Sequence, residues 1–141
     1  MFAVEVRDRI MIAHSLPDPF FGPAQNMHGA TFVVDVAFMR ETLTKQNVVV
    51  DIGAALDVLH ATLKPLAYQN LDEIAEFKGK LTTTEFLARH IFERIKTAAR
   101  SGALGEDGKG LSRIRVTLNE TDLARAWCEG PVNDETGAPG A

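Results

Sequence analysis

The sequence has 141 residues, a formal net charge of −4 and one cysteine, and 45% of its residues are hydrophobic. Its 15 basic residues are scattered among 19 acidic ones, which argues against a nucleic-acid-binding surface built from clustered Lys and Arg. The lone Cys128 excludes an intramolecular disulfide and a cysteine-based metal cluster. No apolar run has the length of a membrane span, and charges interrupt residues 1–14, where a secretory signal would be apolar. We therefore expect a single cytoplasmic domain over residues 1–128.

The first half of the sequence predicts two strands separated by a loop. Residues 2–14 alternate between apolar and polar with a period of two, which is typical of a half-buried strand. Asp8 interrupts the apolar face, which favours a β-bulge at this position. Residues 15–26 contain three prolines and a glycine and are expected to form a long loop. Alternation returns in residues 28–40, which predicts the second strand.

Two helices are predicted next. Asp51 is a suitable N-cap for a helix whose apolar residues recur at steps of three and four up to Leu63, just before Pro65. Thr82 and Glu85 have the spacing of a capping box, which predicts the start of the second helix. A cluster of glycines between positions 102 and 110 ends it.

The last part of the sequence predicts two further strands and a tail. Residues 113–119 alternate clearly and residues 123–128 alternate weakly. Residues 129–141 are rich in Pro, Gly and acidic residues, and we expect them to be a disordered tail. The order ββααββ segregates strands from helices, which predicts an α+β domain with two helices on one face of a four-stranded antiparallel sheet.

In three of these strands the apolar face ends in a polar side chain of a type that binds metals or ligands. His14 ends the first strand, His28 begins the second and Glu120 follows the third. Adjacent antiparallel strands would bring the two histidines together at one edge of the sheet. Imidazoles are common zinc ligands, and a carboxylate can bind two parallel N–H groups of a heterocycle. The alternative is that each is an ordinary solvated residue at a strand end.

The sequence also resembles the 6-pyruvoyl-tetrahydropterin synthase and 6-carboxytetrahydropterin synthase family over nearly all of residues 2–128. The motifs that carry the resemblance are Ala13-His14, His28-Gly29, Val49-Val50-Asp51-Ile52, Asn70-Leu71-Asp72, Thr82-Thr83-Thr84-Glu85 and Val116 with Glu120-Thr121. None of these motifs is specific alone, and the resemblance rests on their order and spacing.

The resemblance implies a tunnelling fold, in which three subunits close a 12-stranded barrel and two trimers usually stack into a hexamer. Closure of the barrel would remove the exposed edges of a four-stranded sheet. The resemblance also implies active sites between subunits, a reduced pterin as substrate, a zinc ion held by His14 and His28, and a lyase reaction.

Several positions depart from the family pattern. The family binds zinc through three histidines, but the third position is Ala30 here, so the zinc site is incomplete; Asp18 or Asn26 of the long loop are alternative ligands. The family's catalytic cysteine falls at Ala24. Its assisting Asp-His pair falls at Ala67 and Tyr68, which leaves Tyr68 as a catalytic candidate with aromatic packing as its alternative role.

The substrate-binding positions are retained. The resemblance implies that Glu120 binds the pterin ring, and Thr82, Thr83 and Thr84 at a helix N-terminus are candidates to bind an anionic substrate, or simply to cap the helix. Three hypotheses follow. The chain is a divergent pterin enzyme acting on 7,8-dihydroneopterin triphosphate or a related reduced pterin, a non-catalytic pterin or purine binder, or a structural homo-oligomer with relic site residues.

Overall fold

The structure is a computed structural model that describes residues 1–133, so most of the predicted tail, residues 134–141, lies outside the described part of the chain. Its elements, in chain order, are β1 (Phe2–His14), the 3-10 helix η1 (Pro19–Gln25), β2 (His28–Arg40), α1 (Ile52–Leu63), the 3-10 helices η2 (Leu71–Glu73) and η3 (Ala75–Phe77), α2 (Thr84–Arg100), the short α3 (Gly105–Gly108), β3 (Arg113–Asn119) and β4 (Arg125–Pro131). Among the described residues, no helix is both long and apolar enough to cross a membrane.

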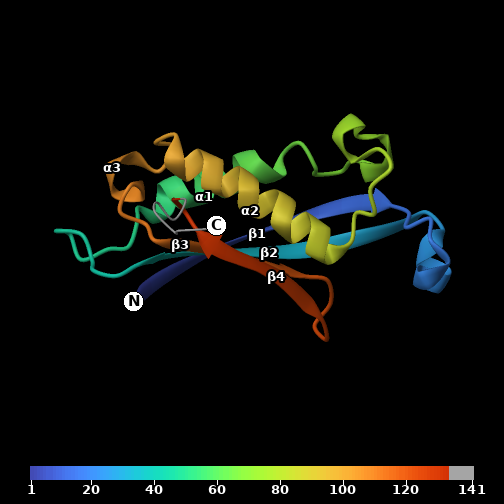
Figure 1. Cartoon of the computed structure of the whole chain (residues 1–141), viewed down its shortest axis with the longest axis horizontal. Coiled ribbons are helices and arrows are strands. Elements are labelled where there is room, and N and C mark those ends of the chain that lie inside the picture. Colours follow the sequence, from blue (N-terminus) through green and yellow to red (C-terminus); the bar gives the residue numbers. More distant parts are fainter. Residues whose placement is uncertain (134–141) are drawn as a thin grey trace, which may run out of the picture.

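The four strands form one antiparallel sheet in the order β1-β2-β3-β4, and α1 and α2 cover one face of it (Figure 1). The alternation predicted from the sequence directs one set of side chains under the helices. Phe32, Val34, Val36 and Phe38 of β2 are at most 1% exposed and pack in the core with Leu59 of α1. The predicted α+β architecture, with two long helices on one face, is therefore confirmed.

The bulge predicted at Asp8 is wrong. β1 and β2 pair in one unbroken register from Phe2↔Arg40 to His14↔His28, and Asp8 lies opposite Val34 without an extra residue. The Asp8 carboxylate lies 3.5 Å from Nδ1 of the exposed His60 on α1. A polar residue on the covered face is tolerated here because it reaches the solvent-exposed edge of that helix.

The two helix starts differ in how well the sequence located them. Asp51 caps α1 as predicted, since its carboxylate accepts the backbone N–H of Ala54 at 2.7 Å. α2 begins one residue later than the predicted capping box. Its N-cap is Thr83, whose hydroxyl accepts the N–H of Phe86, and Thr82 is buried before the helix.

β4 extends further than the sequence indicated. It was expected over residues 123–128 but runs from Arg125 to Pro131, and the following Val132 is buried and donates its N–H to the Ser112 carbonyl. Gly130 permits this pairing because a Cβ there would lie 2.9 Å from the ring of Phe92. The ordered domain therefore continues past the expected boundary at residue 128.

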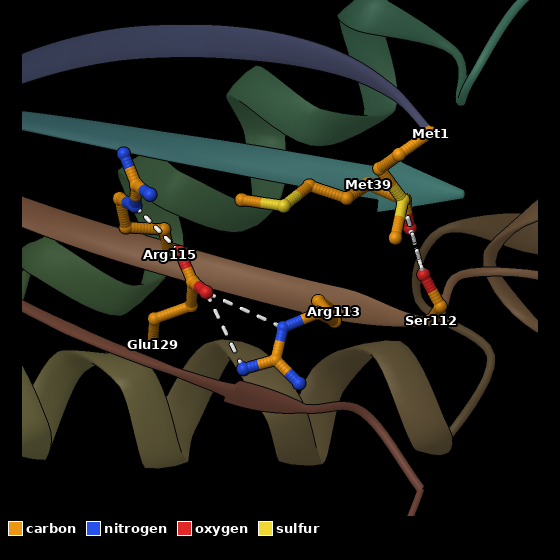
Figure 2. A network of polar contacts seen from close by, with 6 residues as sticks. All are labelled: Met1, Met39, Ser112, Arg113, Arg115 and Glu129. Carbon is orange, nitrogen blue, oxygen red and sulfur yellow. Dashed lines mark hydrogen bonds and ion pairs between the residues drawn. The ribbon is translucent and has the colours of Figure 1, made fainter. Parts of the chain in front are cut away.

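The face of the sheet that no helix covers is polar and rich in arginine. Figure 2 shows two of these arginines, where Arg115 Nε lies 2.6 Å from one carboxylate oxygen of Glu129 and Arg113 bonds the other at 3.3 Å. The guanidinium of Arg115 also lies over the exposed ring of Trp127, 5.8 Å from its centroid. Arg113, Arg115 and Glu129 thus neutralise one another's charges on this face.

Candidate functional site

The candidate site lies at the end of the molecule where β1 ends and β2 begins. The register places His14 opposite His28, and their ring centroids are 4.6 Å apart in an edge-to-face arrangement. This confirms the prediction that antiparallel pairing brings the two histidines together. The loop around η1 and the segment between α1 and α2 reach the same end of the molecule, and the β3–β4 hairpin points in that direction but stops short of it, since Asn119 at the end of β3 lies opposite Val33 of β2 (Figure 1).

His14 is the buried member of the pair. It is 4% exposed, and its Nδ1 lies 3.0 Å from the hydroxyl of the equally buried Thr82. Burial lowers the pKa of His14 below its ordinary value, and the neighbouring His28 lowers it further. His14 is therefore a neutral imidazole near pH 7, held in place through Nδ1 with Nε2 left for other partners.

His28 is the more accessible member of the pair. Its Nδ1 lies 2.8 Å from the backbone carbonyl of Asn26. A carbonyl can only accept, so Nδ1 carries the proton, and in the neutral ring Nε2 presents a lone pair. Both rings thus have Nδ1 engaged, which is the arrangement that usually fixes the orientation of metal-binding or proton-transferring histidines.

The donor set does not fit the zinc site that the family resemblance implies. A catalytic zinc normally has three protein ligands, whereas position 30 is an alanine on the same face of β2 as His28. The Asp18 carboxylate accepts the N–H of Phe20 at 2.8 Å, and Asn26 binds His28 through its backbone. Within residues 1–133 no three His, Cys, Asp or Glu side chains gather where they would hold a metal.

The remaining histidines and the cysteine lie elsewhere. His60 is exposed on α1 beside Asp8, and the ring of His90 on α2 packs against Phe77 at 4.9 Å. Cys128 lies in β4 opposite Val116, and burial raises the pKa of its thiol. It remains a protonated thiol near pH 7, unlike a catalytic cysteine, whose pKa is lowered.

The segment after α1 packs along the outer edge of β1. The N–H of Tyr68 donates to the Met11 carbonyl at 2.7 Å, and Ala13 donates to the Gln69 carbonyl at 3.0 Å. Tyr68 takes a left-handed backbone conformation with φ of 59°, and its side chain is 82% exposed. The structure therefore displays Tyr68 at the rim and does not bring its phenol into hydrogen-bonding contact with either histidine.

Asp72 is a site residue that the sequence reasoning did not single out. Its carboxylate accepts hydrogen bonds from both the backbone N–H and the hydroxyl of Ser15, the residue after His14. Its negative charge raises the pKa of His14 slightly against the effect of burial. The only signal in the sequence was its place in the Asn70-Leu71-Asp72 motif.

The three threonines at the start of α2 have separate roles. Thr82 binds His14, Thr83 caps the helix, and Thr84 is buried. The prediction of a capping box at Thr82 is wrong because the buried contact with His14 takes that hydroxyl. The hydroxyls of Thr82 and Thr83 therefore have partners within the chain, whereas the binding of an anionic substrate by the backbone N–H groups of this segment stays a prediction.

Glu120 lies in the tight turn between β3 and β4. The N–H groups of Glu120 and Thr121 both donate to the Ala124 carbonyl, at 3.1 and 3.3 Å. The Glu120 carboxylate has no hydrogen bond or ion pair to any described residue. Glu120 is one of the residues that line a cavity of about 440 Å³, together with Arg7, Thr31, Val33, Asn119, Thr121, Asp122 and Arg125. Its charge also raises the pKa of His14, so the turn and the histidine pair interact electrostatically.

A buried polar network holds the strand end that carries Glu120. Asp35 is 7% exposed and binds Arg7 through Nε and Nη2 at 2.6 and 3.0 Å. Asn119, which precedes Glu120, donates its amide to Asp35 and to the Val33 carbonyl, both at 3.0 Å. The Arg7 hydrogen bond lowers the pKa of Asp35 below its ordinary value, so Asp35 stays ionised and anchors the end of β3.

A single antiparallel sheet with its helices on one face and this strand pairing places the chain in the tunnelling-fold class. The chain belongs to the family described as 6-pyruvoyl tetrahydropterin synthase, whose model matches residues 3–131. No curated protein matches the sequence closely enough to extend this assignment.

Solved structures agree with this fold at low sequence identity. The structure is similar to 6-pyruvoyl tetrahydropterin synthase from Caenorhabditis elegans, with 23% identity, a TM-score of 0.76, and coverage of 92% of this chain and 95% of the other. The enzyme from Plasmodium vivax has 13% identity and a TM-score of 0.71, covering 93% and 99%. The enzyme from Plasmodium falciparum has 11% identity and a TM-score of 0.65, covering 92% and 98%.

Proposed function

We propose that the chain is a divergent pterin-metabolism enzyme of the lyase type that acts on 7,8-dihydroneopterin triphosphate or a related reduced pterin. The observation that supports this most is that Glu120, whose carboxylate has no partner among the described residues, lines a cavity. A pterin ring presents adjacent N–H donors about as far apart as two carboxylate oxygens, so one glutamate can accept both. The membership of residues 3–131 in the family supports the same substrate class.

The proposed chemistry is proton transfer that accompanies elimination or cleavage of the pterin side chain. The Nδ1 atoms of His14 and His28 both have hydrogen-bond partners within the chain, so the Nε2 atom of each ring is the one that can accept or donate a proton. The phenol of Tyr68 is accessible at the rim and is the third candidate. Because two imidazoles do not complete a zinc site, we derive no step through a metal.

A non-catalytic pterin or purine binder is the second candidate. It is favoured by the alanines at positions 24 and 67, since alanine cannot transfer a proton, and by the absence of a hydrogen-bond partner for the exposed Tyr68 hydroxyl among the described residues. Product analysis after incubation with 7,8-dihydroneopterin triphosphate separates the two. Turnover supports the enzyme, and bound but unchanged substrate supports the binder.

We also propose that the functional unit is a homo-oligomer, a trimer or a dimer of trimers, with sites between subunits. In the described chain β1 and β4 are the two outer strands of the sheet, and an exposed sheet edge is usually paired or covered. The rim position of Tyr68 beside β1 would place it next to a neighbouring subunit. A purely structural oligomer is the outcome if no pterin or purine binds.

Glu120→Ala tests the pterin assignment. We expect it to weaken binding of 7,8-dihydroneopterin by about tenfold or more, because charge-assisted hydrogen bonds contribute about 1.5–3 kcal/mol. Isothermal titration calorimetry measures the effect. Asp122→Ala is the matched control, since Asp122 lies in the same turn and lines the same cavity. Equal affinity in wild type and Glu120→Ala would remove Glu120 from the proposed site.

A further inference from the structure

Arg125 is the first residue of β4 and lies opposite Asn119, the last residue of β3. The turn from Glu120 to Ala124 is fixed by two backbone hydrogen bonds to the Ala124 carbonyl. Glu120 and Arg125 are therefore held on the two sides of one tight turn, and both line the cavity of about 440 Å³ described above.

Arg125 and Arg9 are the arginines of this face that have no side-chain partner among the described residues, and of these two Arg125 lines the cavity while Arg9 does not. Arg7 binds Asp35, and Arg113 and Arg115 share Glu129. Within residues 1–133 the Arg125 guanidinium makes no hydrogen bond or ion pair, and its positive charge helps to lower the pKa of Asp35.

The absence of a pair is informative because acidic groups line the same cavity. Glu120 and Asp122 are both among the lining residues, yet neither forms an ion pair with Arg125 in the described chain. The cavity thus presents an unpaired acceptor, Glu120, and an unpaired donor, Arg125. A ligand that binds both residues carries N–H donors for Glu120 at one end and a negative charge for Arg125 at the other.

We propose that Arg125 is a specificity-determining residue that binds an anionic group on the side chain of the pterin whose ring Glu120 holds. This inference rests on the proposed function. The planar guanidinium presents parallel N–H donors that match the oxygens of a phosphate or a carboxylate. The cavity is within the size range of small-molecule sites, and Arg125 selects anionic pterins over neutral ones.

Calorimetry with three ligands tests the proposal: 7,8-dihydroneopterin, its triphosphate, and a dihydropterin with a carboxylate at the same ring position as the side chain. We expect wild type to bind at least one of the anionic ligands about tenfold more tightly than the neutral one. A preference for the triphosphate alone assigns a phosphate subsite, and a preference for the carboxylate alone assigns a carboxylate subsite. Either preference supports the proposal.

Two variants locate the effect. Arg125→Gln is expected to lose the preference while it retains the affinity for neutral 7,8-dihydroneopterin. Arg115→Gln is the matched control, because Arg115 lies on the same face but pairs with Glu129 and does not line the cavity, and it is expected to keep the preference. Thermal unfolding of both exposed variants verifies that they are folded.

The possible results distinguish a failure of the Arg125 proposal from a failure of the proposed function. If wild type binds the neutral and anionic pterins equally, or if Arg125→Gln keeps the preference, the role of Arg125 is overturned while pterin binding stands. If Arg115→Gln loses the preference as fully as Arg125→Gln does, the effect is the general charge of this face and the proposal is overturned. If wild type binds none of the three ligands, the proposed function fails as well.

Discussion

The two faces of the sheet are stabilised in different ways. Under the helices, Val34, Val36 and Phe38 are fully buried, and stability comes from the removal of apolar surface from water. On the open face, several charged side chains are neutralised by neighbours on the same face, as in the binding of Arg7 by Asp35. The covered face is a packed apolar core. On the open face, the buried Asp35 joins Arg7 and Asn119 in a polar network that lies beside the unpaired Glu120 and Arg125.

The largest loss of stability is expected from a substitution in the core under the helices. Phe38→Ala is expected to lower the free energy of unfolding by about 3–5 kcal/mol, because it leaves a cavity under the helices. Phe2→Ala is the matched control on the same pair of strands, since Phe2 is 48% exposed and Phe38 is fully buried. Urea unfolding measures both. Similar losses for the two variants would mean that the covered face is not a close-packed core.

A smaller effect is expected from the buried network of the open face. Asp35→Asn is expected to cost about 1–2 kcal/mol at pH 7, because it weakens the charge-assisted bonds from Arg7 and Asn119. Asp57→Asn, at an exposed carboxylate on α1, is the control. Urea midpoints of the three proteins at one pH give the comparison.

The pH dependence of the same variant adds a second measurement. The pKa of Asp35 is lower in the folded protein than its ordinary value, so the folded state favours the ionised form. Its contribution is fully present above the unfolded pKa of about 3.9 and is lost as the pH falls through the lower folded value. The stability difference between wild type and Asp35→Asn should therefore shrink below about pH 4. A difference that grows with acid would reverse the assigned sign.

The same contrast explains which elements could be predicted from the sequence. β1, β2, β3 and α1 match their expected bounds because apolar residues recur on one face of each, and the covering helices enforce that pattern. β4 was placed too early because Leu123 suggests a strand, although it is 90% exposed in the turn. Its true end depends on Gly130 packing against Phe92, which no local pattern reveals.

The site was predictable only where register determined it. The pairing of His14 with His28 follows from two strand ends of an antiparallel hairpin. The sequence could not decide whether Thr82 or Thr83 caps the helix, because adjacent threonines have the same capping chemistry. A buried contact between Thr82 and His14 decides between them. Arg125 carries no sequence signal at all, since its significance is the absence of a partner in three dimensions.

The smallest expected effect tests whether the open face is open in solution. Glu129→Gln is expected to cost less than about 1 kcal/mol, and the loss should fade at high salt, because its ion pairs with the half-exposed Arg113 and Arg115 are screened. Urea unfolding at low and high salt measures this. A salt-independent loss of several kcal/mol would mean that these charges are removed from water. Since no element of the described chain covers them, that result would place part of another subunit over this face.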